Sequence, residues 1–455
     1  MGEAGQRGRL FGTDGVRGVA GYELTASLAL DLSVAAATVL AGAGGIGGAA
    51  GPPVAVVGRD PRASGEFLEA AVVAGLASAG LGVLRLGVIP TPGVAYLTEA
   101  LGATFGVVIS ASHNPAQDNG IKFFGRGGVK LPDSVEDEIE DRLGSRPKVT
   151  SFGRVSDAAA EQERYLDHLL ATLPADPGQA LAGLRVVADC AHGAAYRLAP
   201  QALRRAGAEV IAIGAEPDGL NINAGVGSTC LDTLAAAVVE HGADAGIAYD
   251  GDADRCLAVD ADGQPLDGDQ ILALLATELR EAGRLAHDAV VVTVMSNQGF
   301  HVAMRDAGIT VIETPVGDKH VSAAMRDGGY TLGGEQSGHI ILIEHATTGD
   351  GILTSLQLLS AVHRRGMPMA AAATMMRKYP QVLVNVPGDA SRLGPLVDAA
   401  VVRAETQLGG NGRVLVRPSG TEPAIRLMVQ AADAGLAEQV IGQLAAEVRL
   451  ALVGQ

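Results

Sequence analysis

Short apolar runs alternate with longer helix-like stretches along most of this chain, and the same order of elements occurs three times. Apolar strands are expected at VAVVGRD (54–60), LRVVADCAHG (184–193) and VVVTVMSNQG (290–299). The helix-like stretch after each strand stops at an Ala-Gly pair, a helix C-terminal signal, at Gly80, Gly207 and Gly308. A second apolar strand follows in every copy. The pattern predicts three related α/β modules with parallel or mixed sheets.

Each module then leads through a third strand or turn to a loop with polar side chains. These loops are SASHNP (110–115), DGDADR (250–255) and GGEQSGH (333–339). Ligands bind beyond strand ends in sheets of this kind, so three equivalent loops could face one cleft.

The last ~80 residues, enough for one small domain, break the pattern. QVLVNVP, GRVLVRPSGTEP and AIRLMVQA predict strands, and LAEQVIGQLAAEVRLAL predicts a terminal helix. We therefore expect an α/β protein of four domains: three related α/β modules with mixed sheets and a C-terminal α+β domain, around one central cleft. The expected domains are 1–155, 156–262, 263–372 and 373–455.

Composition narrows the classes of function. The chain has 455 residues, too many for one ordinary core, and 47% of them are hydrophobic, which indicates a folded globular protein. A net charge of -17 argues against nucleic acid as a main partner, although a local basic pocket can still hold a small phosphorylated ligand. The three cysteines form no CxxC pair, so reduced thiols are expected rather than a disulfide framework or a zinc site.

We expect a cytoplasmic protein with no membrane partner. MGEAGQRGRL lacks the apolar region of a secretory signal. The most membrane-like run, residues 24–41, is rich in Ala and carries Asp31, which favours a packed amphipathic helix. The sequence does not set the oligomeric state, and a homodimer is compatible with it.

The DGDADR loop places Asp250, Asp252 and Asp254 at alternate positions after an apolar strand. Three carboxylates spaced in this way can converge on a hard cation, and Mg²⁺ commonly combines a few carboxylates with a phosphate oxygen. An EF-hand is excluded, because its sixth and twelfth positions would be Arg255 and Ala261. A solvated acidic turn is the alternative.

The SASHNP loop offers Ser110 and Ser112 as candidate nucleophiles. The flanking glycines of a G-x-S-x-G elbow are absent, which disfavours a hydrolase of that kind. By itself the loop is also compatible with a simple hydrogen-bonded turn. Lys122 and Lys319, two of the few lysines, fall in Gly-bearing loops, which hints at a role such as proton transfer that Arg cannot fill.

Three further loops carry candidate binding residues. In GGEQSGH, Glu335 and Ser337 suit sugar hydroxyls or an amine, and His339 suits proton transfer or a turn cap. RPSGTEP (417–423) combines the Arg417 guanidinium with hydroxyls and backbone amides, a set that suits a phosphate dianion, and Arg426 lies nearby. FGTDGVRG (11–18), with Arg17, is a weaker phosphate-loop candidate.

Together these segments resemble the α-D-phosphohexomutases. The match runs from Phe11 to about Arg426, with the motifs in the family's order. FGTDGVRG is similar to the opening loop, ISASHNP to the phosphoserine loop, DGDADR to the magnesium loop, GEQSGH to the sugar-recognition loop and RPSGTEP to the phosphate-binding loop. The resemblance points to Ser112 rather than Ser110 as the phosphorylated residue.

The resemblance implies an isomerase of carbohydrate metabolism that moves a phosphoryl group within its substrate. It implies a Mg²⁺ ion held by phospho-Ser112, Asp250, Asp252 and Asp254. Catalytic roles are expected for Ser112, Lys122, His339, Arg17 and Arg255. Substrate contacts are expected from Glu335, Gln336, Ser337, Arg417, Ser419, Gly420, Thr421 and Arg426.

Within the family, Gln336 and the segments DCAHGA (189–194) and HATTGDG (345–351) resemble the members that act on amino sugars. Those members interconvert glucosamine 6-phosphate and glucosamine 1-phosphate through glucosamine 1,6-bisphosphate, which leads to UDP-N-acetylglucosamine. Two departures are Lys319-His320 in VGDKH, where many relatives have Arg-Tyr, and Cys230, where His is common. The Lys319-His320 pair bears on contacts between domains or on the positioning of the sugar.

Three alternatives remain at this point. The same chemistry could act on mannose or glucose phosphates. A catalytically silent sugar-phosphate binding protein is a different class, and the intact Ser112 and three Asp residues argue against it. A simple metal phosphatase is the weakest alternative.

Overall fold

A computed structural model describes residues 9–12, 14–42, 52–146, 148, 151–174, 176–388, 394–409, 412–418 and 424–453. The chain divides into two compact units. The first unit runs to Val294 and includes Ile312–Ala372, and the second comprises Met295–Val311 and the chain from Ala373 onward.

The first module is built on a six-stranded mixed sheet with the order β1-β5-β4-β2-β3-β6. Strand β2 is parallel to both β3 and β4, and β5 runs antiparallel to β4. Its elements are β1 (Val16–Val19), β2 (Val54–Arg59), α2 (Ser64–Ser78), β3 (Gly82–Val88), α3 (Thr91–Ala100), β4 (Phe105–Ile109), β5 (Asp118–Phe124) and β6 (Val155–Asp157).

The second module has the sheet order β11-β10-β9-β7-β8, again with one antiparallel neighbour of the third strand. Its elements are β7 (Arg185–Asp189), α6 (Leu198–Arg205), β8 (Glu209–Ile213), α7 (Asp232–His241), β9 (Ala245–Tyr249), β10 (Cys256–Asp260) and β11 (Pro265–Leu266).

The third sheet has the order β13-β12-β14-β15, with β14 parallel to β12 and antiparallel to β15. Its elements are β12 (Ala289–Thr293), α9 (Gln298–Asp306), β13 (Thr310–Thr314), α10 (Asp318–Gly328), β14 (Leu332–Gly334) and β15 (Ile340–Leu342). The three modules therefore share one strand order, in which the second, first and third strands are followed by an antiparallel fourth. The prediction of three related α/β modules with mixed sheets is confirmed.

The predicted helix ends are also confirmed. Helices α2, α6 and α9 have Ala79, Ala206 and Ala307 as their C-terminal caps. The next residue in each case is a glycine with positive φ, at 94°, 102° and 67°. A side chain is disfavoured in that backbone conformation, which explains why the same Ala-Gly pair recurs.

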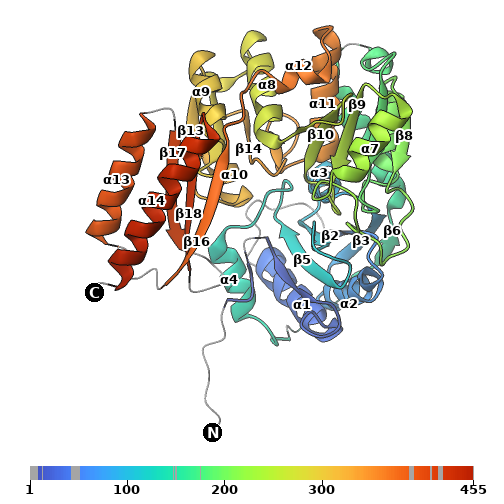
Figure 1. Cartoon of the computed structure of the whole chain (residues 1–455). Helices are drawn as coiled ribbons and strands as arrows, with labels where there is room; N and C mark the ends of the chain where they lie inside the picture. Colours follow the sequence, from blue (N-terminus) through green and yellow to red (C-terminus); the bar gives the residue numbers. More distant parts are fainter. Residues whose placement is uncertain are drawn as a thin grey trace. The chain divides into compact units, whose positions relative to one another are not determined.

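Apolar sequence places the strands that carry the loops inside the first unit. All five residues of β4, and all five of β9, are buried, as expected for central strands covered on both faces. Helix α1 (Ala26–Gly42) packs beside α2 and belongs to the same apolar core (Figure 1). The remaining helices of this unit are α4 (Asp133–Asp141), α5 (Gln162–Ala171), α8 (Gly268–Glu281), α11 (Gly351–Arg364) and α12 (Met369–Ala373), with short 3-10 turns at Ala159–Glu161, Pro177–Gln179 and Ala286–Asp288.

The second unit contains a three-stranded antiparallel sheet with the order β16-β18-β17. Helices α13 and α14 lie side by side against one face of this sheet (Figure 1). Alternate strand residues, among them Ile425, Leu427 and Val429, join the helices in one apolar core. The elements are β16 (Gln381–Pro387), α13 (Pro395–Leu408), β17 (Gly412–Pro418), β18 (Ala424–Ala431) and α14 (Ala434–Val453), which confirms the predicted α+β segment.

Among the helices of the described residues, none combines the length and the apolarity that crossing a bilayer requires.

Candidate active site

Ser112 follows the buried strand β4 and is itself only 1% exposed. Its backbone φ is 51°, an uncommon value for a residue with a side chain. Its hydroxyl donates to Asp250 Oδ2 at 2.5 Å, although 138 residues separate the two in sequence. The local turn therefore aims the serine at the Asp loop of the second module.

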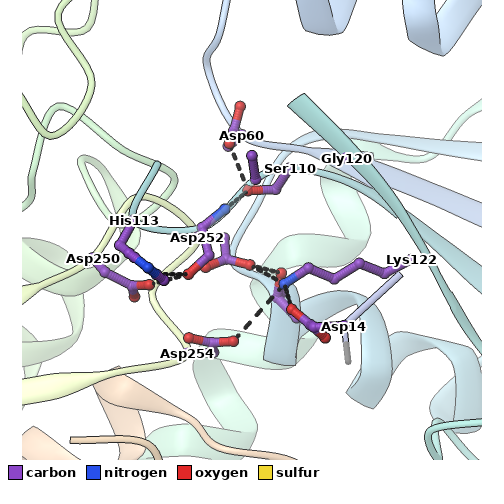
Figure 2. Close-up of polar contacts among 12 residues, drawn as sticks. Asp14, Asp60, Ser110, His113, Gly120, Lys122, Asp250, Asp252 and Asp254 are labelled. Atoms are coloured by element: carbon purple, nitrogen blue, oxygen red, sulfur yellow. Dashed lines mark hydrogen bonds and ion pairs between the residues drawn. The ribbon is translucent and has the colours of Figure 1, made fainter. Parts of the chain in front are cut away.

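A buried network holds the backbone of Ser112 on both sides. The Ser112 amide donates to Ser110 Oγ at 3.0 Å, and Ser110 Oγ donates to Asp60 Oδ2 at 2.6 Å (Figure 2). Arg62 pairs with Asp60 at 2.8 Å and donates to the Ser112 carbonyl at 2.9 Å. Arg62 also donates to the carbonyls of Asn114 and Asp118, so one fully buried guanidinium fixes the whole loop.

The three predicted Asp residues converge in the loop between β9 and β10. One carboxylate oxygen each from Asp250, Asp252 and Asp254 lies within 4.8 Å of the others. Close approach to the serine loop requires glycine at position 251, since an added Cβ would meet the Ser112 carbonyl oxygen at 2.4 Å. Figure 2 shows the side chains of Asp250, Asp252 and Asp254 together with Lys122.

This cluster suits a hard divalent cation. All three carboxylates are buried, and Oδ1 of Asp252 and of Asp254 has no hydrogen-bond partner in the described part of the chain. Burial raises the pKa of Asp250, and the negative charges of Asp254 and Asp252 raise it further. A cation with oxygen ligands would satisfy the free oxygens and offset this repulsion. The residues present therefore fit Mg²⁺.

Lys122 lies beside the cluster and belongs to a chain of alternating charges. Its Nζ is 2.6 Å from Asp14 Oδ2 and 2.8 Å from Asp252 Oδ2 (Figure 2). Burial opposes the charge on Lys122, but Asp14 and Asp252 outweigh it and raise its pKa. Lys130 pairs with the other Asp14 oxygen at 2.9 Å and also contacts Asp318. Lys122 is therefore positively charged.

A cavity of about 500 Å³ adjoins these loops, which is in the usual size range of ligand pockets. Arg17, His113, Asp254, Arg255, Glu335 and His339 are among its lining residues. Burial, with the charges of Arg255 and Arg17, lowers the pKa of His113 to about 4. Its neutral Nδ1 lies 3.3 Å from Ser112 Oγ.

His339 is held from the segment that follows it. The Gly349 amide donates to His339 Nε2 at 3.3 Å, and an added Cβ at Gly349 would lie 2.5 Å from that ring atom. His339 Nε2 also lies 3.4 Å from Asp318 Oδ2. Nδ1 is buried and has no partner in the described part of the chain, so it is available to a ligand.

The other residues of the predicted sugar loop differ in their surroundings. Glu335 Oε1 accepts from the Gly317 amide at 3.1 Å. The Ser337 hydroxyl is buried and lacks a partner among the described residues. Gln336 donates its amide to Asp267 Oδ2 at 3.1 Å, and Asp267 caps the N-terminus of α8. Gln336 therefore fixes the loop to α8, and its side-chain oxygen makes no hydrogen bond within the described residues.

The predicted phosphate loop is described only at its two ends. Ser419, Gly420 and Thr421 lie outside the described residues. Arg417 and Arg426 pair directly across β17 and β18, and Asn385 of β16 continues the same row. This row, called the arginine row below, lines a cavity of about 330 Å³ together with Met295, Leu383, Leu415 and Met428. Neither guanidinium has a carboxylate partner within the described parts of the chain.

Sequence reasoning missed Asp14, Asp60, Arg62, Lys130 and Asp318. Asp14 lies inside FGTDGVRG. Asp60 and Arg62 lie just after β2, and the equivalent strands β7 and β12 also lead into polar segments, DCAHG (189–193) and SNQG (296–299). That equivalence could have found them. For Lys130 and Asp318, which are 188 residues apart, the sequence offers no local signal.

Models of four domains describe nearly the whole chain. They are the phosphoglucomutase/phosphomannomutase α/β/α domains I, II and III, at residues 8–149, 163–263 and 267–379, and the C-terminal domain, at residues 374–447. The chain belongs to the phosphoglucomutase/phosphomannomutase family.

One relative within this family is similar to this chain over nearly its full length. The phosphoglucosamine mutase of Thermobifida fusca is 62% identical over 447 residues, which cover 97% of this chain and 98% of that protein.

Two solved structures share the fold. A phosphoglucomutase/phosphomannomutase family protein of Burkholderia thailandensis has a TM-score of 0.80 at 23% identity and covers 97% of both chains. The N-acetylphosphoglucosamine mutase of Aspergillus fumigatus, solved with GlcNAc-6P and magnesium, has a TM-score of 0.63 at 17% identity. The match covers 97% of this chain and 96% of that one.

Proposed function

We propose that this chain is a phosphoglucosamine mutase, which interconverts glucosamine 6-phosphate and glucosamine 1-phosphate. The observation that carries the proposal is the hydroxyl of Ser112 at 2.5 Å from Asp250, inside the three-Asp cluster. The high identity to the Thermobifida fusca enzyme supports the amino sugar as substrate. The proposed domains remain 1–155, 156–262, 263–372 and 373–455.

In the proposed reaction, phospho-Ser112 donates its phosphoryl group to O1 of glucosamine 6-phosphate. The P–Oγ bond breaks and a bond from phosphorus to O1 forms. The O1 proton leaves to a nearby base, and the released Ser112 Oγ takes up a proton. Glucosamine 1,6-bisphosphate results. The bisphosphate reorients in the site and returns its 6-phosphoryl group to Ser112. Glucosamine 1-phosphate is then the product.

Asp250, Asp252, Asp254 and phospho-Ser112 would hold Mg²⁺, which supplies charge neutralisation during phosphoryl transfer. The Aspergillus fumigatus structure with magnesium supports this choice of ion. Arg17 and Arg255, which line the cavity, would stabilise the phosphoryl oxygens. Lys122 and His339 are the proposed proton-transfer residues. For Lys122, the pairing with two carboxylates favours the role of proton donor over that of base.

Glu335, Gln336 and Ser337 are the proposed contacts for the sugar. Arg417, Ser419, Gly420, Thr421 and Arg426 are the proposed contacts for the phosphate that is not reacting. Remote binding of this kind fixes the reactive end of the substrate and lowers the entropic cost of reaching the transition state. A cytoplasmic location and a homodimer belong to the same proposal, and size-exclusion chromatography with light scattering tests the dimer.

The deciding experiment supplies Mg²⁺, glucosamine 6-phosphate and catalytic glucosamine 1,6-bisphosphate and follows glucosamine 1-phosphate by ³¹P NMR. Glucose and mannose phosphates run in parallel. A clear preference for the amino sugar is expected. Preference for glucose or mannose phosphate would keep the chemistry and reject the substrate, and release of free phosphate would indicate a phosphatase. No turnover of any sugar by protein phosphorylated on Ser112 would reject the enzyme.

A second experiment tests the metal loop. Replacement of Asp250 or Asp252 by Ala should abolish the dependence of turnover on Mg²⁺ together with most of the turnover. Unchanged metal dependence in both variants would show that these carboxylates do not hold the ion.

A further inference from the structure

Asp318 lies at the wall of the cavity of about 500 Å³ described above. It is the first residue of α10, and its side chain is 14% exposed and lines the cavity with Glu335 and His339. Its Oδ2 contacts Lys130 and lies 3.4 Å from His339 Nε2. Its Oδ1 makes no hydrogen bond within the described parts of the chain.

The protein holds this carboxylate in a fixed position. Lys130, its partner, is tied at the same time to Asp14 at 2.9 Å. The next residue, Lys319, pairs with Asp133 at 2.6 Å and Glu136 at 2.8 Å, which fastens the start of α10 to α4. A charged group that is already fixed loses little freedom on binding a ligand, so its interaction contributes more to affinity.

The chemistry of an amino sugar calls for such a group. A 2-ammonium carries three hydrogen-bond donors and no acceptor, whereas a 2-hydroxyl can both donate and accept. A carboxylate beside C2 therefore favours the ammonium by charge. The carboxylates of Asp14 and Asp252 are engaged by Lys122, and Asp250 and Asp254 belong to the proposed metal cluster. Asp318 and Glu335 remain on the cavity wall.

We infer that Asp318 is a specificity-determining residue, whose Oδ1 accepts a hydrogen bond from the 2-ammonium of the substrate. The inference rests on the proposed function and names the contact that would separate glucosamine phosphates from glucose phosphates. Glu335, held beside Gly317 at 3.1 Å, would complete an acidic wall for the same group.

The test compares kcat/KM for glucosamine 6-phosphate and glucose 6-phosphate in the wild type and in Asp318→Asn. The ratio of the two values cancels any general damage to the site. At pH 6.5, where an amine of ordinary pKa is protonated, the variant should lose about 10- to 100-fold of the preference for the amino sugar, as for a hydrogen bond to a charged group. Its activity on glucose 6-phosphate should fall far less.

Lys130→Gln is the matched control, because it breaks the same ion pair and keeps the carboxylate. It should keep most of the wild-type preference, because Lys319 still fastens the start of α10 to α4, even if turnover falls on both sugars. Equal losses on both sugars in Asp318→Asn would overturn the inference and leave Asp318 as a structural partner of Lys130. The wild-type ratio tests the proposed function separately: a wild type that prefers glucose 6-phosphate rejects that function, whereas a wild type that prefers glucosamine 6-phosphate with an unchanged variant rejects only the role of Asp318.

Discussion

The serine loop of the first unit and the arginine row of the second differ in how firmly the protein holds their polar side chains. Ser112 is buried, and both its amide and its carbonyl are hydrogen-bonded within the Asp60–Arg62–Ser110 network. Arg417 and Arg426 are partly exposed and line the cavity of about 330 Å³ on one face of their sheet. A reacting group has to be positioned to within a fraction of an ångström, whereas side chains that bind a non-reacting phosphate need positive charge and sufficient length.

The difference matches the two tasks that we propose. A phosphorylated serine must meet two different sugar oxygens in one fixed geometry, which favours a loop with no freedom. The non-reacting phosphate belongs to C6 in one half-reaction and to C1 in the other. Arg417 and Arg426 have no carboxylate partner among the described residues, so their charge is available to a phosphate in either position.

The largest effect should come from Ser112→Ala. Loss of the nucleophile should lower turnover by more than about 10³-fold, even with glucosamine 1,6-bisphosphate supplied. The steady-state assay of glucosamine 1-phosphate formation measures it. Ser110→Ala is the matched control: it keeps the nucleophile and removes one hydrogen bond to its backbone, so turnover should fall only about 10-fold. Normal turnover by Ser112→Ala would move the nucleophile elsewhere.

Next in size is the loss of stability in Arg62→Met. The substitution leaves the Asp60 carboxylate buried without its partner, and breaking a buried ion pair in this way costs about 3–5 kcal/mol. Thermal melting should show a clear fall in Tm. The double variant Asp60→Asn/Arg62→Met removes both charges and should recover part of the loss. A single variant as stable as the wild type would mean that the network does not hold the loop.

A smaller effect, on binding alone, is expected for Arg417→Ala. Loss of a hydrogen bond to a charged group should lower kcat/KM by about 10- to 100-fold, and Tm should stay close to the wild-type value because the side chain has no carboxylate partner among the described residues. Arg426→Lys, which keeps the charge and loses the planar fork, should show a milder loss. A fall in Tm as large as that of Arg62→Met would erase the contrast between the two regions.

The sequence predicted those structural features that depend on a local pattern of residues. The three strand–helix–strand repeats follow from apolar runs and Ala-Gly caps, and the loops with Ser112 and the three Asp residues follow from their place after buried strands. The Arg62 guanidinium reaching the Ser112 carbonyl, and the contact of Lys130 with Asp318, depend on approaches between distant segments. No spacing in the sequence encodes those distances.

The division into two units was likewise invisible in the sequence. Helix α9 occurs at the same point of the repeat as α2 and α6, yet it groups with the C-terminal sheet. There the amide of Gln298 donates to Gln430 Oε1 of β18 at 2.7 Å. The repeat specifies which elements occur and in which order. Which unit a helix belongs to depends on side chains that only one copy of the repeat carries.

The smallest effect is a dependence of stability on pH that comes from Asp350 in the first unit. Its side chain caps α11 by accepting from the Leu353 amide at 2.9 Å, and it accepts from the Tyr165 hydroxyl at 2.8 Å. Burial raises its pKa to about 6, above the ordinary value near 3.8. The folded state therefore favours the protonated acid. This contribution is fully present below about pH 4 and is lost as the pH rises through about 6, up to about 3 kcal/mol for a shift of two units.

Asp350→Asn removes this titration and keeps a polar cap of similar shape. The stability of the wild type relative to the variant should therefore decline as the pH rises from about 4.5 to about 7.5. Thermal melts of both proteins across that range measure the difference, and other titrating groups cancel because the two proteins share them. Ser112→Ala serves as the reference, since its curve should run parallel to the wild type unless the serine loop also carries the pH dependence. Parallel curves for wild type and Asp350→Asn would show that burial alone does not hold this carboxyl protonated in the folded protein.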